Sequence, residues 1–177
     1  MQVQLCKIEG LEANPLIGAY ENPACLDLTC TRIIKIEDGV IYLGTGWKAA
    51  SPPKGYYLEI HPRSSMVKKG WMLANCTGII DPDYRGELIV AIVPTMRMLN
   101  YALRILDGRD LMHVVGNLDY LHKALDLERY FKSTITLPEA LVQICLRPYI
   151  PIAIQEVLSL ISTQRDSGSF GSSNQSQ

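Results

Sequence analysis

Residues 78–87 read Gly78-Ile79-Ile80-Asp81-Pro82-Asp83-Tyr84-Arg85-Gly86-Glu87, and this stretch is the most specific one in the chain. Its centre combines two aspartates around a proline, which is typical of a turn because proline fixes φ and aspartate bonds the nearby backbone. Apolar residues lie on both sides of that centre, and Leu88–Val93 follows directly. The pattern predicts two short strands joined at a hairpin turn.

Short apolar segments recur outward from this stretch and are separated by turn residues. The turn signals are residues 37–39 (EDG), 44–46 (GTG), 51–55 (SPPKG) and 81–83 (DPD). The apolar segments are Ile33–Ile36, Val40–Leu43, Tyr56–Ile60, Met72–Leu73, Leu88–Val93 and Leu141–Leu146. Short strands at this spacing predict an all-β sandwich or barrel.

Length and composition fit one globular domain. The chain has 177 residues, of which 47% are hydrophobic and 20% charged, and such a composition can bury a core. The formal net charge is -1, so the basic surplus of a dedicated nucleic-acid binder is missing. No apolar run approaches the roughly 20 residues of a membrane helix, and the N-terminus lacks a secretion signal. We therefore expect an intracellular protein, cytoplasmic or nuclear, that is not secreted.

The cysteines and histidines show no metal-binding pattern. The five cysteines are Cys6, Cys25, Cys30, Cys76 and Cys145. They contain no Cys-x-x-Cys pair, and a disulfide framework or a zinc finger would favour an even count or paired spacing. The sequence therefore predicts free thiols in a reducing compartment.

Two segments depart from the β pattern. Apolar residues recur at helical spacing over about residues 96–131, which predicts a helical insertion that is too short to hold a core alone. Its methionines would suit a varied partner surface, although packing onto the parent domain is the preferred interpretation. Residues 167–177 consist almost entirely of Gly, Ser, Asn and Gln, which predicts a flexible tail.

Five segments, in order along the chain, resemble the five motifs of the trimeric dUTPase family, the dUTP diphosphatases. They are residues 24–28 (ACLDL), 62–70 (PRSSMVKKG), 78–87 (GIIDPDYRGE), 138–143 (PEALVQ) and 165–174 (RDSGSFGSSN). The second and third motifs match well. The first has Cys25 in place of a glycine, the fourth keeps its glutamine but loses a glycine and an arginine, and in the fifth Asp166, Ser169 and Asn174 replace glycines.

The resemblance implies a fold as well as an activity. The fold is all-β, a jelly-roll-type distorted β-barrel (the β-clip of dUTPases) with the helical insertion between the third and fourth motifs. We expect one domain over residues 1–177, ending in a flexible phosphate-binding arm at about residues 163–177.

The implied reaction is hydrolysis of dUTP to dUMP and pyrophosphate, in which water attacks the α-phosphorus. Asp81 is the expected general base, since an ionised carboxylate can take the proton of that water. Asn75 and the backbone near Gly78 are expected to recognise the uracil edge. Tyr84 is expected to lie under the deoxyribose and exclude a 2′-hydroxyl, and Phe170 to stack on the uracil ring.

The triphosphate requires cations and donors. The implied cofactor is Mg2+, with Asp27 and Gln143 orienting the waters that the ion carries. The phosphate-binding residues that the resemblance implies are Arg63, Ser64, Ser65, Gln143, Arg165, Gly171 and Ser172. Three subunits share each site in the family, which implies a homotrimer.

Two other functions stay open. A dCTP deaminase, a relative with the same fold, would need a catalytic glutamate ten residues after Asp81, where this chain has Ala91. A dUTPase-like regulatory module, weak or inactive as an enzyme, would act through a protein partner bound at the insertion. Neither membrane binding nor direct nucleic-acid binding is expected.

Overall fold

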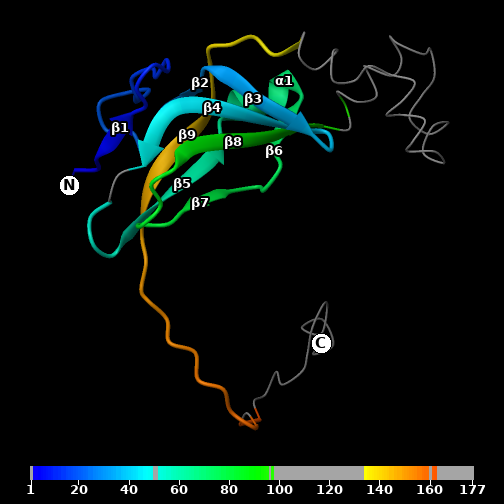
Figure 1. The fold of residues 1–177 in the computed structure, drawn as a ribbon. Helices are drawn as coiled ribbons and strands as arrows, with labels where there is room; N and C mark the ends of the chain where they lie inside the picture. The colour runs from blue at the N-terminus through cyan, green and yellow to red at the C-terminus, as the bar shows by residue number, and fades with distance from the viewer. Residues whose placement is uncertain (1, 50–51, 96, 98–133, 160, 163–177) are drawn as a thin grey trace, which may run out of the picture.

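Two antiparallel sheets face each other in the computed structural model, which describes residues 2–49, 52–95, 97, 134–159 and 161–162 (Figure 1). The elements are β1 (Leu5–Lys7), β2 (Leu26–Cys30), β3 (Arg32–Glu37), β4 (Val40–Ala49), β5 (Tyr56–Pro62), α1 (Ser64–Lys69), β6 (Trp71–Leu73), β7 (Gly78–Ile80), β8 (Glu87–Pro94) and β9 (Glu139–Pro148). One sheet has the order β1-β4-β8-β6, with β3 also paired to β4, and the other has the order β2-β9-β5-β7. The jelly-roll-type all-β fold is confirmed, as two open sheets in the described residues.

Alternating burial along the strands builds the core between the two sheets. In β8 the side chains of Leu88, Val90 and Ile92 are buried while Ile89 is exposed, because successive side chains of a strand point to opposite faces. Facing residues of the other sheet complete the core, among them Leu28, Leu58, Ile60, Leu141, Val142 and Ile144. Each buried aliphatic side chain contributes about 1.5–3 kcal/mol, whereas the outer faces of the strands carry polar residues together with exposed apolar ones such as Ile79 and Ile89.

The turn predicted at residues 44–46 is wrong, because β4 runs straight through it. The β4–β8 ladder shifts register there instead of ending. Gly46 has a φ of 74°, and a Cβ at this position would clash with the carbonyl oxygen of Glu12. The glycine therefore serves a bulge inside a long strand. Arg32 pairs with Glu87 beside the bulge, through two contacts of 2.8 and 2.6 Å.

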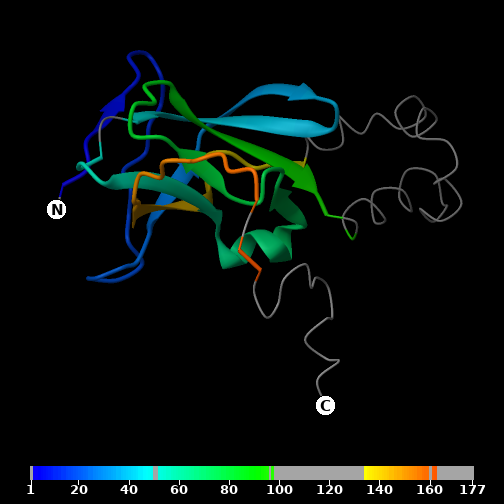
Figure 2. The ribbon, with the colours of Figure 1, turned by 90° about the horizontal axis from the view of Figure 1, so that it is seen from below.

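The helix α1 follows β5 at a position where the sequence pattern predicts no helix. It ends at Gly70, whose φ of 79° and backbone N–H close the last turn, as expected of a left-handed cap. Lys69 forms an ion pair with Glu139 at the start of β9. Figure 2 separates α1 from the β3–β4 hairpin, which overlaps it in Figure 1. The helix thus lies against β9, where it fixes the end of β5.

The prediction that all five cysteines are free is wrong. Cys25 and Cys145 form a disulfide, with their Cα atoms 4.5 Å apart, a normal separation for such a bond. Cys6 and Cys76 are free and exposed, and Cys30 is free and buried. The bonded pair is 120 residues apart in sequence, so only the fold brings the two sulfurs together. The cysteines therefore do not support the expectation of a reducing compartment.

The segment after β9 leaves the body of the molecule (Figure 1). Ile150, Ile152 and Ile154 are all more than four-fifths exposed there, at 88%, 84% and 89%. The predicted helices of the insertion and the C-terminal arm lie outside the described residues. No helix in the described residues combines the length and the apolar character needed to cross a membrane.

Candidate active site

The turn between β6 and β7 brings Asn75 next to Gly78. Residues 74–77 connect the two strands, and the N–H of Thr77 closes a tight turn onto the carbonyl of Asn75 at 2.6 Å. A Cβ added to Gly78 would lie 3.2 Å from the Cβ of Ile60 and 3.8 Å from the amide nitrogen of Asn75. The absence of a side chain at Gly78 therefore leaves its backbone open, with the exposed Asn75 amide beside it.

Asp81 begins the turn that was predicted from the Asp-Pro-Asp sequence. The N–H of Tyr84 donates to the carbonyl of Asp81 at 3.1 Å, as in a β-turn with proline at its second position. The Asp81 side chain is exposed, at the rim of a hollow of about 340 Å³. The residues that line this hollow are Tyr57, Ile79, Asp81, Pro82 and Tyr149. A carboxylate in this position can meet a ligand without any movement of the chain.

The predicted hairpin is wrong, because β7 pairs with β5 in one sheet and β8 pairs with β4 and β6 in the other. The ring of Tyr84 folds back over the turn that links these two strands. Its hydroxyl donates to the carbonyl of Glu87 at 2.9 Å, and a Cβ added to Gly86 would clash with that hydroxyl and its ring. The side chain nevertheless stays 40% exposed. Tyr84 therefore offers a fixed aromatic surface to the solvent, and the glycine after Arg85 is what makes room for it.

Three residues from the first, second and fourth motifs converge on the outer face of the second sheet, and we call them the Asp27 cluster: Asp27, Arg63 and Gln143. Asp27 stands opposite Gln143 in the β2–β9 ladder. Arg63 Nε lies 2.9 Å from Asp27 Oδ1, and Gln143 Nε2 donates to the carbonyl of Pro62 at 3.3 Å. Arg63 is also held by Ala140, whose carbonyl accepts from Nη1 at 2.8 Å. Residues that lie up to 116 positions apart in sequence thus share one polar corner.

The serines of the second motif open α1 beside this cluster. Ser64 is exposed. Ser65 Oγ is buried and, within the described residues, has no hydrogen-bond partner. A buried hydroxyl without a partner is unfavourable, so this atom is suited to a group that the chain itself does not supply.

A second polar cluster was missed in the sequence. Glu59 accepts a hydrogen bond from the hydroxyl of Tyr57, lies 2.7 Å from His61 Nε2, and accepts from Arg147 Nε at 3.0 Å. These hydrogen bonds, with that of Tyr57 the strongest, lower the pKa of Glu59 from 4.5 to about 2. Polar residues at alternate positions 57, 59 and 61 share one face of β5, and this spacing was the available signal.

Asp81 and the Asp27 cluster lie toward opposite ends of β5. Asp81 directly follows Ile80, which pairs with Leu58, whereas Gln143 pairs with both His61 and Asp27. Four residues along β5 and three strands across the sheet give about 20 Å between the two, from the usual rise and strand spacing. A single chain therefore does not bring the expected base next to the Asp27 cluster. The expected residues Arg165, Phe170, Gly171 and Ser172 lie outside the described residues.

The oxygen-rich character of the Asp27 cluster fits Mg2+ in part. Asp27 offers a carboxylate, of which one oxygen bonds Arg63, and Gln143 offers an amide oxygen. The described residues contain no group of three or more His, Cys, Asp or Glu side chains that could hold a metal ion by themselves. These oxygens suit an ion that takes its other ligands from phosphate and water.

Comparison with known proteins agrees with the motifs. A family model described as dUTPase matches residues 14–99. The deoxyuridine 5'-triphosphate nucleotidohydrolase of Desulfotalea psychrophila is 37% identical over 103 residues, which are 52% of this chain and 65%, less than two thirds, of that protein. The enzyme of the same description from Rickettsia massiliae is 29% identical over 174 residues, 97% of this chain and 95% of that one.

A solved structure shares the fold at lower identity. A dUTPase of Staphylococcus bacteriophage 80alpha, solved with dUpNHpp, matches with a TM-score of 0.64 and 18% identity, covering 97% of this chain and 98% of that one. The family model, these relatives and the five ordered motifs agree in one respect: the chain is similar to proteins of the dUTPase family.

Proposed function

We propose that the chain is a dUTP diphosphatase, which hydrolyses dUTP to dUMP and pyrophosphate. The observation that supports this best is the turn of the third motif. Asp81 stands exposed beside a hollow at the end of β7, and Asn75 and the open backbone of Gly78 stand at the start of the same strand. This strand with its flanking residues, which we call the β7 segment (residues 75–84), thus offers both a base for water and a surface for a nucleobase.

In the proposed reaction water attacks the α-phosphorus while Asp81 accepts one of its protons. The bond that forms joins the water oxygen to the α-phosphorus. The bond that breaks joins that phosphorus to the oxygen bridging to the β-phosphate, and pyrophosphate leaves with this oxygen and the bonding electrons. Asp81 then passes its proton to the solvent.

We assign the selectivity for base and sugar to the β7 segment. The main chain near Gly78 presents N–H and C=O groups to the uracil edge, and Asn75 adds an amide. Tyr84 forms the floor under the deoxyribose. Because its ring is held by Glu87 and Gly86, it cannot retreat to make room for a 2′-hydroxyl.

The phosphates are assigned to the Asp27 cluster and the two serines beside it. Arg63 gives charge-assisted hydrogen bonds, and Ser64 and Ser65 give hydroxyls. Asp27 and Gln143 would hold the waters of Mg2+, and this ion, when bound, supplies positive charge against the triphosphate. Arg165, Gly171 and Ser172 of the arm would complete the phosphate contacts, and Phe170 would cover the uracil ring.

We further propose a homotrimer in which each site takes the β7 segment from one subunit and the Asp27 cluster from another. The separation of about 20 Å within one chain leaves each half of the site without its complement. The exposed Ile150, Ile152 and Ile154 alternate as in a strand that lacks a neighbour, which also favours self-association. A partner protein at the insertion and an intracellular location remain predictions.

Deamination of dCTP is disfavoured by β8. The position ten residues after Asp81 is Ala91, which pairs with Tyr42 in the ladder. No carboxylate occurs between Leu88 and Pro94. The deaminase reaction lacks its glutamate on this strand.

A substrate panel tests the proposal. The purified protein is incubated with dUTP, dCTP, UTP and dTTP, with Mg2+ and with a chelator, and the products are separated by ion-exchange chromatography. We expect dUTP alone to be converted, to dUMP and pyrophosphate, and only with Mg2+. Conversion of dCTP would support the deaminase instead, and a folded assembly that turns over no nucleotide would support the regulatory module.

A further inference from the structure

Cys145 lies in the β2–β9 ladder that pairs Asp27 with Gln143, and its disulfide partner Cys25 directly precedes β2. Asp27 pairs with Gln143 and Leu26 with Ile144, so the two cysteines face each other at the next step. Their Cα separation of 4.5 Å is that of a non-hydrogen-bonded antiparallel pair. Residues two apart share a face, and the disulfide is therefore on the face of the Asp27 cluster, one side-chain row away.

The strand that carries Asp27 is short and lies at the end of its sheet, although its residues Leu28 and Cys30 are buried in the core. β2 is an end strand of its sheet and has five residues. Its register with β9 shifts between Leu28 and Thr29, just beyond Asp27. On the other side Asp27 donates its N–H to Ile17 at 2.8 Å, through an isolated bridge. Asp27 thus lies between a register shift on one side and the disulfide on the other. Of these two features, only the disulfide links β2 covalently to β9.

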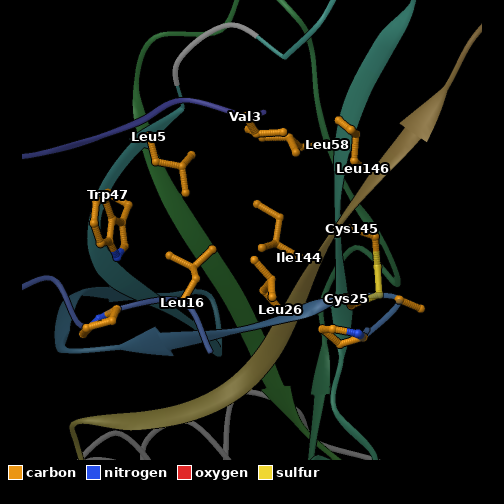
Figure 3. Close-up of a pocket in the computed structure, with 13 residues that line it drawn as sticks. Val3, Leu5, Leu16, Cys25, Leu26, Trp47, Leu58, Ile144, Cys145 and Leu146 are labelled. Carbon is orange, nitrogen blue, oxygen red and sulfur yellow. A yellow bond between two sulfur atoms is a disulfide. The ribbon is translucent and has the colours of Figure 1, made fainter. Parts of the chain in front are cut away.

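The disulfide borders an apolar pocket of about 690 Å³, whose wall includes both cysteines. Leu26 and Ile144 line this pocket from the face of the ladder opposite to Asp27 and Gln143. Figure 3 shows the disulfide there, beyond Leu26 and Ile144. Cys25 is partly exposed, whereas Cys145 is buried. Attack by a small thiolate on the Cys25 side of the bond is sterically possible.

We propose that the Cys25–Cys145 disulfide is a redox-controlled positioning element, which holds Asp27 against Gln143 and Arg63 when oxidised and releases it when reduced. This inference rests on the proposed function, since the Asp27 cluster is there the phosphate and Mg2+ site. A dithiol supplies two electrons and two protons. Its thiolate attacks one sulfur, a mixed disulfide forms, its second thiol displaces the protein sulfur, and the products are two protein thiols and the oxidised dithiol.

A redox role reconciles the proposed function inside cells with the presence of a disulfide. DNA precursors are handled inside cells, where disulfides are usually transient and often redox-sensing. A purely structural disulfide would be out of place there, whereas one that borders a ligand cluster and an open pocket can report the redox state. The other buried thiol cannot take this role, because burial raises the pKa of Cys30 to about 12 and keeps it protonated.

The test compares the wild-type enzyme before and after reduction with dithiothreitol. We expect reduction to raise KM for dUTP about tenfold, as for loss of a group that orients metal-site ligands, with a smaller effect on kcat. Amide hydrogen exchange at Asp27 should accelerate, since its bond to Ile17 loses its anchor. Reoxidation with diamide should restore both values.

Two variants complete the test. The double variant Cys25→Ser with Cys145→Ser should behave as reduced wild type and ignore dithiothreitol, which removes Cys76 from consideration. Cys6→Ser, at an exposed free cysteine, should respond as wild type. Unchanged exchange at Asp27 on reduction overturns the inference whatever the activity, whereas changed exchange in a protein that does not hydrolyse dUTP overturns only the proposed function.

Discussion

Asp81 and Asp83 stand two residues apart in one exposed turn, yet only Asp81 is assigned a chemical role. Replacing Asp81 with asparagine keeps the shape and removes the base. We expect kcat to fall by about 10²–10⁴, while calorimetry shows dUpNHpp binding within a few-fold of wild type. Asp83→Asn is the matched control and should keep its kcat. Equal losses in the two variants would show that the turn matters for its structure alone.

The ring of Tyr84 owes its place to a neighbour without a side chain. A Cβ at residue 86 clashes with the Tyr84 hydroxyl, so Gly86→Ala should displace the ring. We expect the ratio of kcat/KM for dUTP over UTP to drop about tenfold, the scale of one lost steric contact. Tyr84→Phe keeps the ring over Gly86 and should keep the ratio. If Gly86→Ala still rejects UTP as wild type does, Tyr84 is not the sugar gate.

At the scale of elements, the outer face of β5 carries a row of polar side chains with Glu59 at its centre. The pKa of its carboxyl is lowered to about 2 by its hydrogen bonds, so the folded chain binds that proton more weakly than the unfolded chain. The stabilisation is therefore complete above pH 4.5 and is lost as the pH falls toward 2. Urea titrations in steps across this window should show a shallower loss in Glu59→Gln than in wild type.

The control for this pH series is Glu37→Gln. Glu37 also carries an ion pair, with Lys35, but on the exposed β3–β4 hairpin, where such pairs contribute little. Its pH dependence should match wild type. If Glu59→Gln also matches wild type, the hydrogen bonds of Tyr57, His61 and Arg147 contribute nothing to stability.

Most strands could be predicted because they are short apolar segments between turn residues, as at Leu88–Val93. Gly44-Thr45-Gly46 misled the prediction, since the glycines that end a strand and those that bulge one have the same sequence signature. The hydrogen-bonded polar row on β5 could not be predicted for a related reason. Alternating polar residues indicate a solvent-facing side, and only the ladder shows that Glu59 meets Arg147 from β9.

At the scale of the whole molecule, the proposed division of the site can be tested by mixing two inactive variants. Asp81→Asn lacks the base and Arg63→Ala lacks a phosphate contact. Unfolded together and refolded, they should regain about a quarter of the wild-type activity in randomly mixed trimers, where each site draws on two subunits. Each variant refolded alone is the control. No recovery in the mixture, with mixed trimers verified by native mass spectrometry, would place both residues in one subunit's site.

The disulfide also ties distant parts of the chain. It closes a sequence separation of 120 residues, and removing it should lower the free energy of unfolding by about 2–4 kcal/mol. Urea titration of Cys25→Ser with Cys145→Ser, without reductant, measures this change. Cys6→Ser should unfold as wild type. An unchanged midpoint in the double variant would mean that the pairing adds no stability.

The site was predictable to the extent that its motifs are local. Gly78, Asp81 and Tyr84 lie within one stretch of seven residues, so their grouping could be anticipated, whereas the pairing of β7 with β5 instead of β8 could not. The meeting of Asp27 with Arg63 and Gln143 agrees with the family resemblance, but its ion pair and register come from the fold. The disulfide could not be anticipated, since an odd number of cysteines at wide spacing defines no pairing.

The edge position of β7 bears on how the protein tolerates mutation. Within the part of the chain that the structure describes, β7 pairs with β5 on one side and ends the sheet, which leaves its outward N–H and C=O groups open to a flat nucleobase. Every amino acid except proline carries those groups. A substitution of the exposed Ile79 by any of these residues can alter solubility or packing, but it leaves the main-chain N–H donor and C=O acceptor in place. Uracil preference would then be inherited through the shape of the main chain, and drift in the side chains of this strand would leave it intact.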